Sequence, residues 1–242
     1  MHETLCNVIE PWEHGEVLLA TEYPNYWNYN LVQVAGDPGL TADELIGVAD
    51  EKLARYEHRR VDFLDADAAE KVRSGFEKAG WQASRLVYMV HSGELPPGET
   101  PPVKEVDYDA VVELRREWNH EDFPTVDQED HLLVAKEVSL ARGARVIASV
   151  EGEVPVGFAQ VEFIDGDAEV TQVFVSAAQR GSGRGTAITR AAIQSSLGEV
   201  GDLFIIADDE DRPKELYTRL GFLPAWVTTE FTRLPGVGTS LV

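Results

Sequence analysis

Nine residues near the middle of the chain constrain its fold more than any other feature. Residues 94–102 read ELPPGETPP, so four of the nine are proline. Proline fixes φ and has no backbone N–H to donate, so neither an α-helix nor an interior strand can run through this stretch, which is typical of a semi-rigid spacer. We therefore predict two domains, residues 1–93 and 103–242, joined by a proline-rich linker at 94–102.

Composition excludes several classes of partner. The chain has 242 residues, of which 43% are hydrophobic and 26% charged, a globular mixture that excludes wholesale disorder. It carries 21 basic and 43 acidic residues, a formal net charge of −22. Such a chain repels phosphate backbones and anionic membranes, so we expect no nucleic-acid or membrane partner. The acidity suits cationic partners, and solubility explains it equally well.

The sequence shows no pattern for a disulfide, a metal site or a membrane segment. Cys6 is the only cysteine, and the six histidines have neither HxxxH nor HExxH spacing. The first residues, MHETL, lack the basic and long apolar segments of a signal peptide. Apolar runs such as residues 203–207 are far shorter than the roughly 20 residues that span a bilayer. We predict a soluble, cytoplasmic protein without a metal site.

Both halves alternate strand-like and helix-like segments. Thr41 and Glu44 have the spacing of a capping box, and Asp65 or Asp67 can cap a second helix that ends at Gly80. The first half is predicted to have strands at 16–21, 28–34, 59–64 and 81–91, with helices from 41 to about 56 and from 65 to 80. The second half is predicted to have strands at 103–105, 144–151, 156–164, 168–175, 203–207 and within 223–234, with helices at 109–118, 128–140, 184–197 and 212–220. This alternation implies crossover connections and an α/β fold with a mixed sheet in each domain.

The two halves also share a short pattern. Residues 76–81 read FEKAGW and residues 217–222 read YTRLGF, each with an aromatic residue, a charged helix end, a glycine and a second aromatic residue. The order strand, helix, strand, helix precedes both segments. We interpret this correspondence as an internal duplication.

A glycine-rich turn in the second half indicates anion binding. Residues 173–187 read VFVSAAQRGSGRGTA, so a strand-like segment leads through alternating glycines into a helix. Glycines let backbone N–H groups converge on an anion, and the helix N-terminus adds partial positive charge, as pyrophosphate binding requires. The turn lacks the lysine of a P-loop and has Thr186 where the dinucleotide fingerprint requires glycine.

The charges around this turn agree with that interpretation. Residues 170–197 contain no Asp or Glu, although these types make up 43 of the 242 residues. The same window contains Arg180, Arg184 and Arg190. A buried strand and a small-residue helix would also exclude acids, but they do not account for the arginines. A local cationic patch in an acidic chain favours a polyanionic ligand.

These residues resemble those of the GNAT-type N-acyltransferases. The family signature, Arg/Gln-x-x-Gly-x-Gly/Ala between a strand and a helix, is matched by residues 180–185, RGSGRG. A second family element, Leu-Tyr-x-x-x-Gly-Phe, is matched by residues 216–222, and the resemblance covers about 103–237. The first half is similar to the same fold without the signature. Its corresponding segment, residues 35–40, reads AGDPGL, in which Asp37 would repel a phosphate and Pro38 removes a donor. The resemblance implies a tandem protein with a degenerate N-terminal repeat.

The resemblance implies direct transfer of an acetyl group from acetyl-CoA to an amine, with no covalent enzyme intermediate. Strand 168–175 would splay from its parallel neighbour, so that backbone groups of Val173 and Val175 pair with the pantetheine arm. The amides from Gly181 to Thr186 would hold the pyrophosphate. The cofactor contacts expected on this basis are Val173, Phe174, Val175, Arg180, Gly181, Ser182, Gly183, Arg184, Gly185 and Thr186.

The resemblance also suggests catalytic groups. Tyr217 lies where the family often keeps its general acid, and a phenol with a pKa of about 10 is protonated at neutral pH. A tyrosine packed in the core is the alternative. Glu169, near the position of the catalytic glutamate in histone-type members, and Glu162 on the preceding strand are the candidate bases; on period-two alternation Glu169 shares a face with Val173. Both could instead be solvated carboxylates, with ordered water as the base.

The acceptor is less constrained. The acidic loop at 119–127, between two helices, would attract a small cationic amine, or it is an exposed connector. The family's asparagine before the tyrosine helix is replaced by the acids of 208–211, which could bind the amine or cap the helix. The degenerate half could take the place of a second subunit, so we expect a monomer or weak homodimer. A non-catalytic acyl-CoA-binding or sensing protein and a pure interaction module are the alternative functions.

Overall fold

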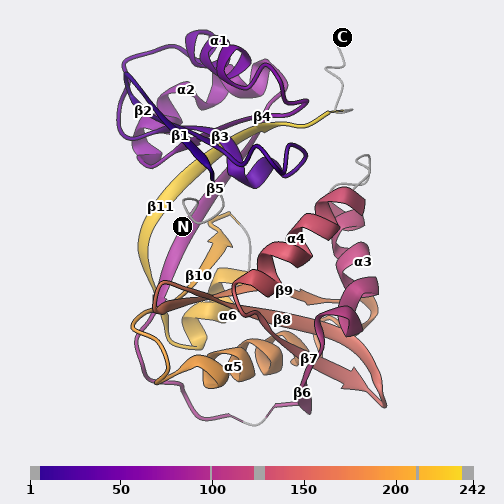
Figure 1. Cartoon of the computed structure of the whole chain (residues 1–242). Helices are drawn as coiled ribbons and strands as arrows, with labels where there is room; N and C mark the ends of the chain where they lie inside the picture. The colour runs from indigo at the N-terminus through magenta and orange to yellow at the C-terminus, as the bar shows by residue number, and fades with distance from the viewer. Residues whose placement is uncertain (1–5, 99, 123–128, 211–212, 236–242) are drawn as a thin grey trace. The chain divides into compact units, whose positions relative to one another are not determined.

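The computed structural model of the chain describes residues 6–98, 100–122, 129–210 and 213–235. It has a mixed α/β fold with a large mixed sheet and helices, as predicted (Figure 1). Its contacts divide the described residues into two compact units. The first comprises residues 6–86, 129–134 and 227–235, and the second comprises residues 87–98, 100–122, 135–210 and 213–226.

The first unit is a sheet covered by two helices. Its elements are β1 (Val8–Trp12), β2 (Gly15–Leu19), the short 3-10 helix η2 (Trp27–Tyr29), β3 (Asn30–Val34), α1 (Ala42–Lys52), β4 (Arg59–Phe63), α2 (Ala66–Lys78), the first part of β5 (Gln82–His91) and the last part of β11 (Phe222–Arg233). β1, β2 and β3 are antiparallel in sequence, β3 and β4 are parallel, and β11 is antiparallel to β4. The predicted caps are confirmed: Thr41 and Glu44 form a capping box before α1, and Asp65 caps α2. β1 was not predicted.

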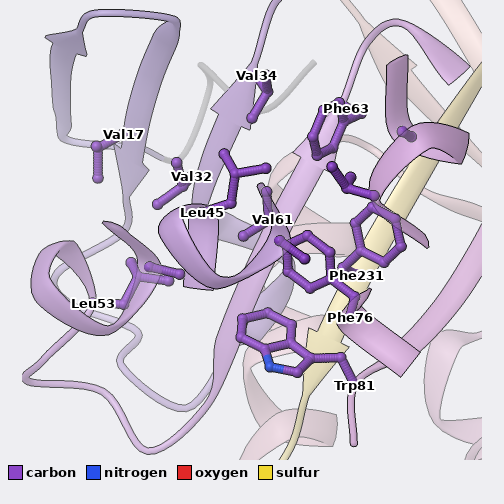
Figure 2. Packing of buried hydrophobic residues seen from close by; sticks show 14 of the residues in the cluster. Val17, Val32, Val34, Leu45, Leu53, Val61, Phe63, Phe76, Trp81 and Phe231 are labelled. Carbon is purple, nitrogen blue, oxygen red and sulfur yellow. The ribbon is translucent and has the colours of Figure 1, made fainter. Parts of the chain in front are cut away.

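The core of this unit lies between the sheet and its helices (Figure 2). Phe231 of β11 is fully buried and stacks on Phe76 of α2, with ring centroids 4.2 Å apart. The edge of Phe63 meets Phe231 at 5.8 Å, and Trp81 meets Phe76 at 5.1 Å. Burying one such side chain stabilises the fold by about 1.5–3 kcal/mol. A strand from the far end of the chain is therefore part of the N-terminal core.

The second unit contains the remaining elements. They are β6 (Val103–Val106), the 3-10 helix η3 (Tyr108–Val111), α3 (Val112–Asp122), α4 (Glu129–Ala141, whose first residues belong to the first unit), β7 (Arg145–Glu151), β8 (Val154–Ile164), β9 (Asp167–Val175), the 3-10 helix η4 (Ala177–Gln179), α5 (Arg184–Ser196), β10 (Leu203–Asp208) and α6 (Pro213–Arg219). β6 to β9 are antiparallel in sequence, and β10 is parallel to β9. α3 lies on one side of these strands and α5 on the other (Figure 1). The predicted helix at 109–118 is split between η3 and α3, and residue 128 lies outside the described residues.

The two units repeat one topology. β1, β2, β3, α1, β4 and α2 follow the same order and the same strand pairings as β7, β8, β9, α5, β10 and α6. Gly80 after α2 and Gly221 after α6 both have positive φ, 80° and 98°, as glycines that end helices do. This agreement supports the internal duplication that the sequence suggested.

The compact units differ from the continuous domains 1–93 and 103–242. Residues 229–233 of β11 pair with β4 of the first unit, and the proline-rich residues 94–102 lie inside the second unit. The described part of this stretch has no helix or strand, as its prolines require, but Arg190 of α5 donates to the carbonyl of Pro96 and so fastens it to its own unit. The residues of a strand do not specify which sheet edge it joins, so sequence alone could not reveal that the end of β11 belongs to the first unit.

Candidate functional site

Two strands of the second unit are paired over only part of their length. The parallel register of β9 and β10 runs from Ala168 opposite Leu203 to Val170 opposite Ile205. Beyond this point β9 continues to Val175 and β10 to Asp208. In the described register, the edge of β9 that faces β10 is therefore unpaired from Thr171 onward. An unpaired strand edge presents N–H and C=O groups to any extended molecule that can align with it.

The other edge of β9 contains a bulge. Gln160 of β8 is opposite Thr171, but Phe158 is opposite Phe174, so β9 has one residue more than β8 over this interval. Gln172 in the bulge has φ of 52°, a left-handed conformation that costs a non-glycine residue about 1–3 kcal/mol. The bulge corrects the expectation from alternation: Phe174, not Val173, follows Thr171 on the face of Glu169.

The glycine turn follows directly. Gly181 and Gly183 have φ of 79° and 80°, and residues 181–183 are exposed. Gly183 is the N-cap of α5 and supplies no side-chain cap. The first α5 amide to bond within the helix is that of Ala187, to the carbonyl of Gly183 at 3.0 Å. The amides from Gly183 to Thr186 thus have no intrahelical acceptor, as at any helix start, and they can serve an anion.

Contacts bring this turn to the end of β9 and to α6. A Cβ on Gly185 would lie 3.8 Å from Leu216 of α6 and 4.0 Å from Val175 of β9. Tyr217 is buried, with its ring 6.3 Å from that of Phe222. The two family-like motifs are therefore neighbours in the fold.

Two of the three arginines in residues 170–197, the stretch without Asp or Glu, bind protein groups near the turn. Arg180 donates to the carbonyl of Val175 at 2.9 Å and pairs with Glu121 of α3 at 2.5 Å. Arg184 donates to Ser149 Oγ at 2.8 Å and to the carbonyl of Val150 at 3.1 Å. Arg184 thus fastens the turn to β7, whereas Arg180 holds an exposed ion pair that a ligand can exchange. These contacts give the arginines, in part, a structural role.

The equivalent place in the first unit is closed. β3 and β4 stay paired to the end of β3, where Val34 is opposite Phe63 and accepts from the amide of Leu64. β2 and β3 are paired without a bulge. The edge of β3 is therefore not available to a ligand in the way that the edge of β9 is.

The turn before α1 is also satisfied from within. The amide of Gly39 donates to Asp37, and the amide of Thr41 donates to Glu44 at 2.8 Å. A hydrogen bond from Lys71 lowers the pKa of Asp37, so this carboxylate keeps its charge. Asp37 and Lys71 line a cleft of about 440 Å³ beside α2. Carboxylates of the chain thus occupy donors that would otherwise serve an anion.

Glu162 and Glu169 lie directly opposite each other on β8 and β9, both buried. Glu162 forms an ion pair with Arg142 at 2.9 Å and accepts from Ser139 at 2.8 Å. Burial raises the pKa of Glu169 to about 8, and the charge of Glu162 adds to this effect. Both carboxylates were predicted as candidate bases, whereas Ser139 and Arg142 were not, because no local pattern indicates which distant side chains a strand residue contacts.

The acidic segments that we assigned to the acceptor are described in part. Residues 119–122 form the end of α3, where burial raises the pKa of Asp122, and residues 123–127 lie outside the described residues. Asp208 accepts from the amide of Glu210 at 2.8 Å, and Asp209 binds Lys214 at 3.0 Å. Residue 211 is outside the described range. The acids after β10 that the structure describes therefore form local contacts before α6.

Residues 108–222 match the family model of the acetyltransferase (GNAT) family. Over 94% of both chains, the fold is similar to that of a conserved protein of unknown function from Staphylococcus epidermidis, with a TM-score of 0.69 and 16% identity. A GCN5-related N-acetyltransferase from Sphaerobacter thermophilus has a TM-score of 0.57 and 15% identity, over 84% of this chain and 73% of that one. A tandem GNAT protein from the clavulanic acid biosynthesis pathway has a TM-score of 0.52 and 15% identity, over 82% and 70%.

A search of the curated proteins gives no match. Among the described residues, no helix is long and apolar enough to span a membrane, and no three His, Cys, Asp or Glu side chains gather as a metal site would require.

Proposed function

We propose that this chain, whose residues 108–222 match the acetyltransferase (GNAT) family model, is an N-acetyltransferase that moves an acetyl group from acetyl-CoA to a primary amine. We further propose that the acceptor is small and cationic and that the second unit alone carries the reaction. On this proposal the first unit is structural, and the protein acts in the cytoplasm as a monomer or weak homodimer.

One combination of features carries the proposal. The second unit has a strand edge that is open beyond Val170 and, in contact with its end, a helix whose cap has no side-chain acceptor. An extended chain of amides that ends in a pyrophosphate fits both: the amides along β9, the phosphates at Gly181–Thr186. The first unit, with the same topology, has neither feature. This contrast supports one cofactor site per chain.

The chemistry needs a proton acceptor and a proton donor. Acetyl-CoA supplies an acetyl group activated as a thioester. The C–N bond to the amine forms as the C–S bond breaks, the amine loses a proton, and the departing thiolate takes one. We assign the donor to Tyr217 of α6. We assign the acceptor, directly or through water, to Glu169 rather than Glu162, because Arg142 and Ser139 already hold Glu162.

Acidic groups near Arg180 support a cationic acceptor. Glu121 pairs with Arg180, and Asp122 lies beside it at the end of α3. If a phosphate displaces Glu121 from Arg180, the freed carboxylate can attract an ammonium group. The net charge of −22 would favour the approach of such a substrate.

The test separates binding from turnover. Calorimetry should detect acetyl-CoA binding, and a panel of primary amines should include one that releases free thiol. The variant Y217F should bind acetyl-CoA as the wild type does and lose most of its turnover. Binding without turnover across the panel would favour an acyl-CoA sensor, and no binding at all would refute the cofactor site.

A further inference from the structure

A buried polar network surrounds the carboxylate of Glu162. One of its oxygens accepts hydrogen bonds from Ser139 Oγ at 2.8 Å and Gln160 Nε2 at 2.6 Å. The other accepts from Arg142 Nη1 at 2.9 Å. Glu162 is buried, and these three donors hold its carboxylate in place.

The network is fixed from its other end by α3. The guanidinium of Arg115 lies 3.9 Å from the ring centroid of Tyr108 and 4.6 Å from that of Phe158. Its Nη2 donates to Gln160 Oε1 at 2.7 Å. With that oxygen committed to Arg115, the amide nitrogen of Gln160 must face Ser139 and Glu162. The orientation of the donors is thus set by packing.

Glu169 has the opposite environment. It is buried between Glu162 on β8 and the uncharged Phe204 on β10. Within the described residues, no hydrogen bond reaches its carboxyl, and the charges that act on it are Glu162 and, more weakly, Arg142. Ser139 Oγ, Gln160 Nε2 and Arg142 Nη1 bind Glu162 instead. Two carboxyls in direct opposition do not share their stabilisation equally when one has all the donors.

We propose that Glu162 is a positioning residue: by engaging Ser139, Arg142 and Gln160, it leaves the facing, buried carboxyl of Glu169 without a hydrogen-bond donor. The consequence for catalysis rests on the proposed function. Glu169 can take a proton from the amine only after it has lost its own to solvent, so transfer should accelerate as the pH rises through about 8.

The ionisation can be measured without any substrate. Glu169 is titrated in the full-length protein through the infrared band of its protonated carboxyl, which is assigned as the band that E169Q removes. In the wild type the midpoint should lie near pH 8. E162Q removes the charge and frees Arg142 to pair with Glu169, which should lower the midpoint by about 1–3 pH units.

Two further variants separate charge from packing. E162D keeps the charge and should keep a raised midpoint. E153Q neutralises an exposed carboxylate paired with Lys104 and should change nothing. A wild-type midpoint in the ordinary carboxyl range, or equal midpoints in wild type and E162Q, would overturn the proposal. A fall in E162D as large as in E162Q would also overturn it, because it would assign the effect to packing.

This outcome is independent of the proposed function. If the Glu169 midpoints are as predicted but no amine is turned over, the acetyltransferase proposal is refuted and the inference on Glu162 stands. Turnover with an unaltered Glu169 titration in E162Q would do the reverse. Where both hold, the pH profile of kcat/KM should shift down in E162Q alongside the infrared midpoint.

Discussion

Truncating Phe231 to alanine should destabilise the N-terminal unit, although the residue is close to the C-terminus. Phe231 is fully buried, stacks on Phe76 at 4.2 Å and meets Phe63 at 5.8 Å. Removing a buried phenylalanine side chain costs about 3–5 kcal/mol, because transfer free energy is lost and a cavity remains. This is a large part of the 5–15 kcal/mol that stabilises a typical domain.

The location of the effect tests whether the end of β11 belongs to the core of the first unit. Because a chain of two units need not unfold in one step, local free energies from amide hydrogen exchange are the appropriate measure. In F231A, amides of α1 and α2 should lose about 3 kcal/mol or more of protection. Amides of α5 should be much less affected. The control L223A, at an exposed position of the same strand, should change neither.

Two results would refute this reasoning. A loss below about 1 kcal/mol would mean that the cavity closes or that Phe231 is not in the core. A loss confined to α5 and β8 would mean that residues 227–233 belong with the C-terminal half, as the continuous domain boundaries suggested.

Two further predictions concern pH and the glycine turn. Burial lowers the pKa of His58 to about 4, against 6.5 when exposed, so the unfolded state binds the proton first and stability falls as the pH drops from about 6.5 towards 4. In urea unfolding, the loss of stability between pH 6.5 and pH 5 should be about 1.5–2 kcal/mol smaller in H58Q than in the wild type; equal losses would contradict it. In the turn, G181A should weaken acetyl-CoA binding by about tenfold in calorimetry, whereas G198A, with nearly the same φ of 84°, should not. Equal affinities in both variants would contradict a cradle at residue 181.

Local features of the sequence predicted much of the fold. The spacing of Thr41 and Glu44, the position of Asp65 and the glycines after both helices each determine a helix end through contacts a few residues apart. The glycine turn was found because its conformation requires particular residue types. Such features are readable because the interaction partners are close in sequence.

Features that depend on distant partners were not readable. The bulge at Gln172 becomes visible only in the register between β8 and β9, and the pairing of β11 with β4 joins residues far apart in the chain. Two of the three donors around Glu162, Ser139 and Arg142, come from α4 and from the loop that follows it. For these, the sequence restricts the residue type, while the three-dimensional arrangement selects the partner.

The comparison of the two units shows why a single substitution should not create a second cofactor site. Replacing Asp37 would remove a charge from the turn before α1, but Glu44 would still occupy the amide of Thr41. Even with both removed, β3 would remain paired with β4 to its end, because it lacks the extra residue that distorts β9. Opening that edge would break backbone hydrogen bonds, each worth about 0.5–1.5 kcal/mol, with no bulge to favour the change. We therefore expect one equivalent of acetyl-CoA per chain even in the double variant D37G/E44Q, and a second equivalent in calorimetry would show that strand separation does not limit binding.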